Sequence, residues 1–257
     1  MLVATDFDGT ISAIVLDPGA AVLLPGAAAA LAALARHPRA RVAVISGRSL
    51  ADLRARCTIP GVQLVGGHGN EREPGSGAGA KSGGSNGPRW PQPARQLREE
   101  EMPNRPSQAP RPGWSGLEAE MARQAARWPG AQLEVKPWSL TLHYRRVPQC
   151  GAAILAYARD LAAQHGLRLV PGACIAELLP PEACTKGDAV LDLRRELGCD
   201  LALYLGDQAT DEDVFAAADE DLIGIRIGAG PTRAPLYLPD PPAAVAFLAA
   251  LPALLRS

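Results

Sequence analysis

The chain begins with the segment LVATDFDGT, residues 2–10, in which a short apolar run leads directly into two aspartates and a glycine. Such a run ending in a glycine turn is typical of a buried β-strand. Asp6 and Asp8 are two residues apart on an extended segment, so their side chains project to the same side. One carboxylate could attack a phosphorus atom while the other handles the proton of the leaving group. The alternative interpretation is a calcium-binding loop or a plain acidic turn.

Strands and helices alternate after this segment. The pattern predicts a helix over 25–37, which Pro38 ends, a strand over 41–45, a helix over 49–56 and a strand over 62–65. The alternation resumes with a helix over 186–197, a strand over 201–205, a helix over 211–218, a strand over 222–227 and a final helix that ends near 255. We therefore expect an α/β protein with a doubly wound parallel sheet built from residues 1–70 and 180–257.

A different unit stands between these two parts. Residues 72–113 are rich in Gly, Pro, Ser, Arg and Gln, and we expect them to form a flexible insertion because they cannot bury enough apolar surface. Residues 114–179 predict two helices, over 114–128 and 151–165, together with β-segments over 133–136, 139–146, 167–170 and 175–178. We therefore expect residues 71–179 to form a smaller α+β domain inserted into the first.

Composition limits the class of protein. The 257 residues carry a formal net charge of −1, which argues against a broad surface for nucleic acid or anionic membranes. Neither a signal peptide nor an apolar run long enough to cross a bilayer is recognisable. The chain has five widely spaced cysteines and no Cys-x-x-Cys motif, which fits a reducing compartment. We therefore expect a cytoplasmic protein with no nucleic-acid or membrane partner.

Two short segments could bind phosphate. Ser46-Gly47-Arg48 follows the strand over 41–45, where a hydroxyl and free backbone N–H groups at a helix start suit a phosphate oxygen. An ordinary helix entry capped by Ser46 explains this segment equally well. Thr185-Lys186-Gly187 opens the helix over 186–197, and Lys186 could neutralise charge beside a phosphorylated aspartate. A lone lysine at a helix start is otherwise simply solvated.

An acidic segment follows the strand over 201–205. It reads GDQATDED, residues 206–213, and it includes Asp207 and Asp211. Clustered carboxylates at a strand end suit Mg²⁺, a hard cation that prefers oxygen ligands. The alternative is that Thr210 or Asp211 caps the next helix, and the two roles are compatible. We favour the metal interpretation, because Asp6 and Asp8 need a cation before they can meet a phosphate.

Taken in order, these segments resemble the four motifs of the haloacid dehalogenase-like phosphatase superfamily. The resemblance implies a phospho-aspartate mechanism with Asp6 as nucleophile, Asp8 as general acid and base, and Ser46, Gly47 and Lys186 as phosphate binders. It also implies Mg²⁺ as cofactor, with Asp6, Asp8, Asp207 and Asp211 at the metal site. An insertion between the second and third motifs resembles the C2-type cap of this superfamily.

A narrower resemblance is to trehalose-6-phosphate phosphatases. It rests on Gly67-His68-Gly69, Glu134-Val135-Lys136, Ser139, His143-Tyr144-Arg145, Glu177 and the acidic segment 210–213. The resemblance implies that His68, Glu134, Lys136, Arg145 and Glu177 bind the sugar. Each cap residue taken alone would be a charge on a half-exposed strand. The chain departs from the family at Gln208, where a second Asp is common, at Leu179, where a basic residue is usual, and in the long insertion over 72–113.

The resemblance implies an enzyme that hydrolyses trehalose 6-phosphate to trehalose and phosphate. The first alternative is another sugar phosphatase, acting on mannosyl-phosphoglycerate, sucrose phosphate or a hexose phosphate. The second is a non-catalytic sugar-phosphate sensor, although a sensor has no use for a nucleophile. A small-molecule sugar phosphate is thus the expected partner, with any trehalose-phosphate synthase expected on a separate chain.

Overall fold

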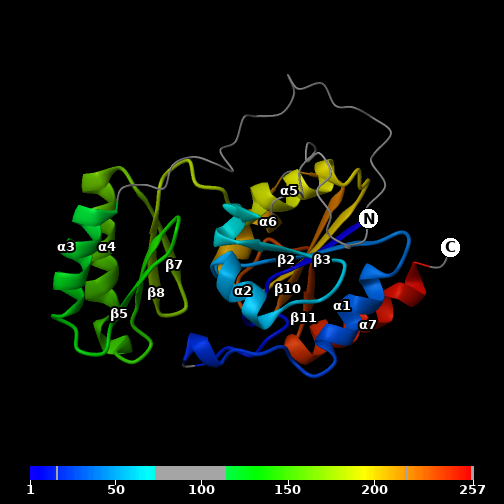
Figure 1. Ribbon diagram of the computed structural model, residues 1–257, viewed down its shortest axis with the longest axis horizontal. Coiled ribbons are helices and arrows are strands. Elements are labelled where there is room, and N and C mark those ends of the chain that lie inside the picture. The colour runs from blue at the N-terminus through cyan, green and yellow to red at the C-terminus, as the bar shows by residue number, and fades with distance from the viewer. Residues whose placement is uncertain (16, 73–113, 218, 256–257) are drawn as a thin grey trace, which may run out of the picture.

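The computed structural model describes residues 1–257 except 16, 73–113, 218 and 256–257. The insertion expected over 72–113 therefore lies outside the described residues, apart from Arg72. The described chain forms two units, each built on its own sheet, which lie side by side in Figure 1.

A seven-stranded sheet forms the larger unit, in the order β11-β10-β9-β1-β2-β3-β4. Neighbouring strands are parallel except for β4, which pairs antiparallel with β3. Because β1 lies between β9 and β2, the strand that leads into Asp6 is the centre of the sheet. The strands are β1 (Leu2–Thr5), β2 (Arg41–Ile45), β3 (Val62–Gly66), β4 (Glu71–Arg72), β9 (Ala202–Gly206), β10 (Leu222–Ile227) and β11 (Leu236–Leu238).

Helices cover both faces of this sheet, and the alternation of side chains along each strand divides the core between them. On one face, Val3 and its neighbours pack with α1 (Ala27–Ala35), α2 (Leu50–Arg56) and α7 (Pro241–Leu254). On the other face, Leu2 and Ala4 pack with α5 (Lys186–Glu196) and the short α6 (Glu212–Phe215). The predicted doubly wound parallel sheet is therefore confirmed.

The smaller unit has a four-stranded antiparallel sheet in the order β5-β6-β8-β7, formed by β5 (Gln132–Val135), β6 (Leu140–His143), β8 (Ile175–Leu179) and β7 (Arg168–Gly172). Its outer face packs on α3 (Ser115–Ala125) and α4 (Gly151–His165), as Figure 1 shows at the left. Leu140, Leu142 and Leu178 point to these helices and are buried. Glu177 alternates with them, so it points to the other face, toward the larger unit.

Several elements differ in extent from the sequence-based expectation. β11 was not predicted, because a three-residue strand is too short to show a periodic pattern. The same holds for β4, which has two residues. The helix expected over 211–218 begins as a 3₁₀ turn, Ala209–Asp211, and continues as α6 only to Phe215. Within the described residues, no helix is both long and apolar enough to cross a membrane.

Candidate active site

The carboxyl ends of the central strands bring the sequence motifs together. Asp6 follows β1, Ser46 follows β2 and Asp207 follows β9, and these three strands are adjacent in the sheet. His68 lies in the 3₁₀ turn Gly67–Gly69 that follows β3. Lys186 is the first residue of α5, which Thr185 caps by accepting from the backbone N–H of Asp188. Ligands in open α/β sheets bind at this edge.

Asp6, Asp207 and Asp211 form a compact group of carboxylates. One oxygen from each lies within 4.8 Å of the others. The ammonium of Lys186 is 2.8 Å from Asp6 Oδ2 and 2.8 Å from Asp211 Oδ1. Asp6, Asp211 and Lys186 are all buried. Two of the three carboxylates therefore contact the same buried ammonium group, and Asp207 lies beside them, partly exposed.

This imbalance of charge appears in the pKa values. Burial raises the pKa of Asp6 well above its usual range against the opposing effect of Lys186, and Asp211 and Asp207 raise it further. Burial, followed by Asp211, raises the pKa of Asp207 to about 7. Burial opposes the charge of Lys186, but Asp211 and Asp6 raise its pKa overall. The site would accommodate further positive charge, and its oxygen ligands suit a hard cation such as Mg²⁺.

Two glycines allow the loops to approach this closely. Gly9 has a φ of 74°, and a Cβ added there would lie 2.1 Å from Asp207 Oδ2. A Cβ on Gly206 would lie 2.3 Å from Asp211 Cγ. Neither contact is possible for a side chain, so these positions require glycine.

Hydrogen bonds fix the orientation of the carboxylates. Thr10 Oγ1 donates to Asp207 Oδ1 at 3.1 Å, and the buried Tyr204 hydroxyl donates to Asp211 Oδ1 at 2.6 Å. The backbone N–H of Gln208 donates to Asp211 Oδ2 at 2.8 Å. Gln208 occupies the N-cap position of the 3₁₀ turn that follows β9, where it makes this backbone bond to Asp211. Because the bond comes from the backbone, it does not depend on which side chain stands at position 208.

Asp8 does not join the three-carboxylate group. Both of its oxygens are held by Arg48, with Nε 2.6 Å from Oδ2 and Nη2 2.7 Å from Oδ1. The guanidinium also lies over the ring of Phe7, 5.5 Å from its centroid. Arg48 stands beside Ser46 in the sequence, and the sequence pattern assigns it no role. Its partner is 40 residues away, and no local signal reports that contact.

Ser46 and Gly47 lie beside His68. Ser46 is buried, and its Oγ accepts from the backbone N–H of Arg48 at 3.2 Å. A Cβ on Gly47 would lie 2.5 Å from His68 Cε1, so the imidazole rests directly on the Gly47 backbone. His68 itself has a φ of 58°, in the left-handed region that non-glycine residues rarely adopt. The turn after β3 thus holds this ring against the turn after β2.

Glu177 connects the smaller unit to this turn. It is 1% exposed and accepts hydrogen bonds from Ser139 Oγ at 2.5 Å and from Lys136 Nζ at 3.0 Å. His68 Nε2 lies 2.9 Å from its other oxygen, and Lys136 also donates to the Gly47 carbonyl at 3.1 Å. Burial opposes ionisation of Glu177, but Lys136 and His68 hold its pKa well below its usual range. The carboxylate is therefore fully paired by protein groups.

The two other predicted sugar ligands lie differently. Glu134 is nearly half exposed, with His143 Nε2 at 2.7 Å and Lys136 Nζ at 3.9 Å from its carboxylate. It therefore borders the Glu177 group. Arg145 donates instead to the carbonyls of Val15 and Ala173. The structure thus brings together His68, Glu134, Lys136 and Glu177, and the contacts of Arg145 are to backbone at another part of the boundary.

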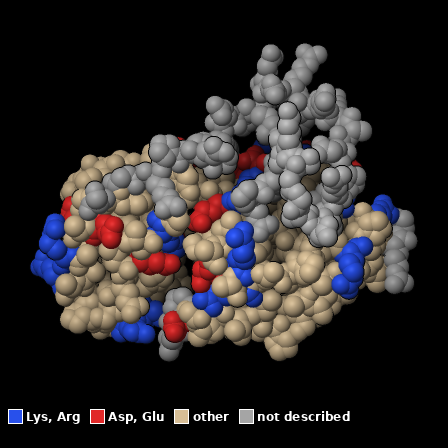
Figure 2. Space-filling model, viewed as in Figure 1, with Lys and Arg blue, Asp and Glu red and all other residues tan. Residues whose placement is uncertain are grey.

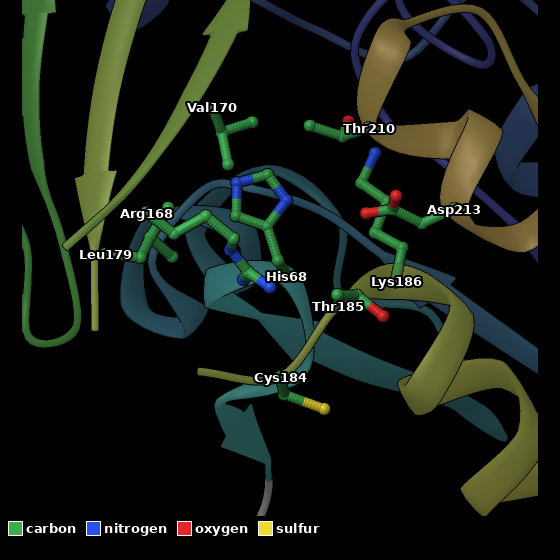
Figure 3. A pocket seen from close by; sticks show the side chains of 9 residues that line it. All are labelled: His68, Arg168, Val170, Leu179, Cys184, Thr185, Lys186, Thr210 and Asp213. Carbon is green, nitrogen blue, oxygen red and sulfur yellow. The ribbon is translucent and has the colours of Figure 1, made fainter. Parts of the chain in front are cut away.

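A small cavity lies at the boundary between the units. Its volume is about 10 Å³, which is room for roughly one water molecule. Figure 3 shows Lys186 and His68 from the larger unit and Val170 from β7 pointing toward it. Its lining residues are His68, Arg168, Val170, Leu179, Cys184, Thr185, Lys186, Thr210 and Asp213. The buried Leu179 thus lines this cavity at the position where the family usually has a basic residue.

A larger cavity of about 560 Å³ lies beside Asp207, and Ile14, Arg226 and Pro241 are among its lining residues. Figure 2 shows acidic and basic side chains along the boundary between the two units. The edge of the sheet where the motifs meet is therefore charged. The cavity of about 10 Å³ beside Lys186 is too small for a sugar.

The sequence of this chain is similar to a family model and to known proteins. The family model described as trehalose-phosphatase matches residues 4–240. A trehalose-phosphate phosphatase of Mycobacterium tuberculosis is 35% identical over 220 residues, covering 82% of this chain and 49% of that protein. A protein of the same organism, described as an uncharacterized glycosyl hydrolase, is 35% identical over 228 residues, covering 86% of this chain and 15% of that protein. This chain therefore spans half or less of the length of these relatives.

The fold also has solved counterparts. The C-terminal domain of the trehalose-6-phosphate phosphatase of C. albicans superposes with a TM-score of 0.73 at 24% sequence identity. The match covers 99% of this chain and 92% of that one. At this identity the likeness concerns the fold, and it extends over both units.

Proposed function

This chain belongs to the trehalose-phosphatase family, and we propose that it hydrolyses trehalose 6-phosphate to trehalose and phosphate. The observation that carries the proposal is the position of Asp6. This aspartate ends the central strand, contacts Lys186 at 2.8 Å and shares a buried site with Asp207 and Asp211. A nucleophilic carboxylate needs such surroundings to meet a phosphate dianion.

The proposed reaction has two steps. A carboxylate oxygen of Asp6 attacks phosphorus, the bond from phosphorus to the sugar oxygen breaks, and Asp8 gives its proton to that oxygen. Water then attacks the phosphorus of the phospho-aspartate, the bond from phosphorus to the Asp6 oxygen breaks, and Asp8 takes a proton from the water. Phosphate is released, and Asp6 and the protonated Asp8 are restored. In this assignment Asp8 acts from the place where Arg48 holds it, with both carboxylate oxygens in contact with the guanidinium.

The phosphate itself would be bound by the larger unit. Ser46 and the backbone at Gly47 border the site, and Lys186 supplies a fixed positive charge. Asp6, Asp207 and Asp211 would hold Mg²⁺, which would offset the repulsion between Asp6 and the phosphate. Gly9 and Gly206 support this assignment, because they let the three carboxylates approach each other around one point.

We assign the sugar to the smaller unit, which would act as a cap formed by residues 71–179 over a catalytic domain formed by residues 1–70 and 180–257. Glu134, Lys136 and Glu177 supply donors and acceptors that suit sugar hydroxyls. With a cavity of only about 10 Å³ beside Lys186, the cap must open for substrate to enter. Sugar hydroxyls would then replace some of the protein groups that now pair with Glu177. Arg145 would bind the sugar from the edge of the cap.

Phosphate release from a panel of sugar phosphates tests this function. Trehalose 6-phosphate, sucrose phosphate, mannosyl-phosphoglycerate and glucose 6-phosphate are compared with and without Mg²⁺. We expect trehalose 6-phosphate to be the best substrate and EDTA to stop the reaction. A preference for another ester would move the assignment to that sugar, and binding without any turnover would favour a sensor.

The cellular setting is a further part of the proposal. The described cysteines are all free thiols, which supports a reducing compartment such as the cytoplasm. We propose that a separate synthase chain supplies the substrate. Localisation by fractionation and copurification with a synthase would test both points.

A further inference from the structure

A line of four charged side chains runs from Asp8 along helix α2. Arg48 holds both oxygens of Asp8, at 2.6 and 2.7 Å. The remaining terminal nitrogen of Arg48, Nη1, is 2.6 Å from Asp52 Oδ2. Arg56 Nη2 is 2.8 Å from the other oxygen of Asp52. Each of the two arginines is thus joined to Asp52, and Asp8 forms one end of the line.

The other end of the line returns to the segment that carries Asp8. Arg56 Nη1 donates to the carbonyl of Gly19 at 2.8 Å and to that of Ala21 at 3.1 Å. Both carbonyls lie in the connection between β1 and α1, which begins just before Asp8. Arg48, just before α2, and Arg56, at its last position, therefore contact this connection at two separate places.

The local geometry of α2 favours this arrangement. Ser49 caps the helix by accepting from the backbone N–H of Asp52, which places Asp52 in the first turn, where a carboxylate is stabilised. Arg56 follows four residues later, so its side chain lies on the same face of the helix. A guanidinium held on two edges cannot rotate freely, and its planar fork sets the plane of a bound carboxylate.

We propose that Asp52 and Arg56 are positioning residues that act through Arg48 to set the direction of the Asp8 carboxylate. The inference rests on the proposed function, in which Asp8 transfers a proton to and from the reacting oxygens. In the described contacts, neither Asp52 nor Arg56 touches Asp6, Lys186 or the other carboxylates of the site. Their effect on turnover would therefore pass through Asp8.

The leaving group distinguishes this role from a general loss of structure. A sugar alkoxide is strongly basic and must receive a proton as it departs, whereas p-nitrophenolate leaves readily without one. A displaced Asp8 should therefore slow the hydrolysis of a sugar phosphate and hardly affect p-nitrophenyl phosphate. A damaged fold would slow both reactions alike.

The experiment compares Asp52→Asn and Arg56→Gln with the wild type on both substrates. We expect kcat for trehalose 6-phosphate to fall by about tenfold in each variant, a fraction of the usual contribution of general acid catalysis. For p-nitrophenyl phosphate we expect a change of less than about twofold. Asp52→Glu should restore part of the loss. The double variant should lose little more than the worse single variant, because both residues act through one partner.

Asp219→Asn is the matched control. It removes a partly buried carboxylate that pairs with Arg194 at 2.7 Å, outside the line of charges. This variant should hydrolyse both substrates with the kcat of the wild type. Equal losses on both substrates in Asp52→Asn, or no loss on either, would overturn the proposal.

A crystal structure of Asp52→Asn provides a readout that does not depend on the substrate. We expect the Asp8 carboxylate to turn or to lose one of its two contacts with Arg48. An unchanged two-point contact would overturn the inference. If the wild type hydrolyses no sugar phosphate, the proposed function fails, and this crystal structure still decides whether Asp52 positions Asp8.

Discussion

Replacing Asp207 by asparagine removes one of the three carboxylates that crowd the candidate metal site. Burial and the neighbouring Asp211 raise the pKa of Asp207 from 3.8 to about 7. The metal-free folded chain therefore keeps this proton to a higher pH than the unfolded chain does. The free energy of unfolding consequently falls as pH rises from about 4 to about 7. Above pH 7, the ionised Asp207 destabilises the metal-free fold.

The shift in pKa gives the size of this effect. A difference of about three pKa units corresponds to at most about 4 kcal/mol, at about 1.4 kcal/mol for each unit. Local relaxation reduces that ceiling, and we expect Asp207→Asn to stabilise the metal-free protein by about 2 kcal/mol at pH 8. For a chain of this size, the melting temperature should rise by about 4–8 °C. At pH 4, the variant and the wild type should melt within about 2 °C of each other.

Magnesium should have the opposite dependence on pH. Its carboxylate ligands must be ionised to bind, so Mg²⁺ should stabilise the wild type at pH 8 and much less at pH 5. At a hundredfold excess over its Kd, the ion adds about 2.7 kcal/mol to the free energy of unfolding. In Asp207→Asn this response should be largely lost.

Calorimetric melting curves at pH 4, 5 and 8, in EDTA and in Mg²⁺, measure all of these effects. Asp219→Asn serves as the control, because its carboxylate pairs with Arg194 outside the three-carboxylate group. That variant should keep the Mg²⁺ response of the wild type. The reasoning is refuted if Asp207→Asn lowers the melting temperature at pH 8 in EDTA, or if Mg²⁺ stabilises the wild type equally at pH 5 and pH 8.

Three further predictions follow from the site. Asp6→Asn should abolish phosphate release from every substrate, because it removes the nucleophile. The melting temperature in EDTA should stay unchanged or rise, because the variant also removes one of the three crowded carboxylates. Turnover close to that of the wild type would contradict the mechanism. Glu177→Ala should lower kcat/KM for trehalose 6-phosphate by about tenfold or more, the scale of a charged hydrogen bond, with little effect on p-nitrophenyl phosphate. We expect the same of Lys136→Ala and Glu134→Ala, and equal losses on both substrates would assign these residues to contact between the units instead. Gly47→Ala should raise KM for every phosphate ester. The methyl group of the new alanine would lie 2.5 Å from His68 Cε1 and displace the turn that carries Ser46. An unchanged KM would show that this turn does not bind phosphate.

Several features of the fold could be predicted from local sequence alone. Short apolar runs followed by Asp6, by Ser46 and by Asp207 indicated parallel strands whose carboxyl ends carry polar groups. This prediction depends on side chains only a few residues apart, and the observed order of β9, β1 and β2 agrees with it. The roles of these residues in catalysis remain predictions, which the experiments above address.

Contacts between distant segments could not be predicted in this way. The sequence placed Asp8 beside Asp6, but the two-point contact with Arg48, 40 residues later, turns Asp8 away from the carboxylate group. Arg145 belongs to the same short segment as His143, yet it donates to the carbonyls of Val15 and Ala173. The direction of each charged side chain depends on which partner the packing brings within reach.

Local residue patterns were enough to predict the alternation of strands and helices, and with it the edge of the sheet where Asp6, Ser46, Lys186 and Asp207 meet. The contact between the two units is visible only in the folded chain. Glu177 and His68 are 109 residues apart and lie 2.9 Å from each other because the register of the smaller sheet points Glu177 toward the larger unit. Periodicity reports which face of a strand a residue occupies, but it contains no information on what that face packs against. That partner depends on how the two units pack against each other.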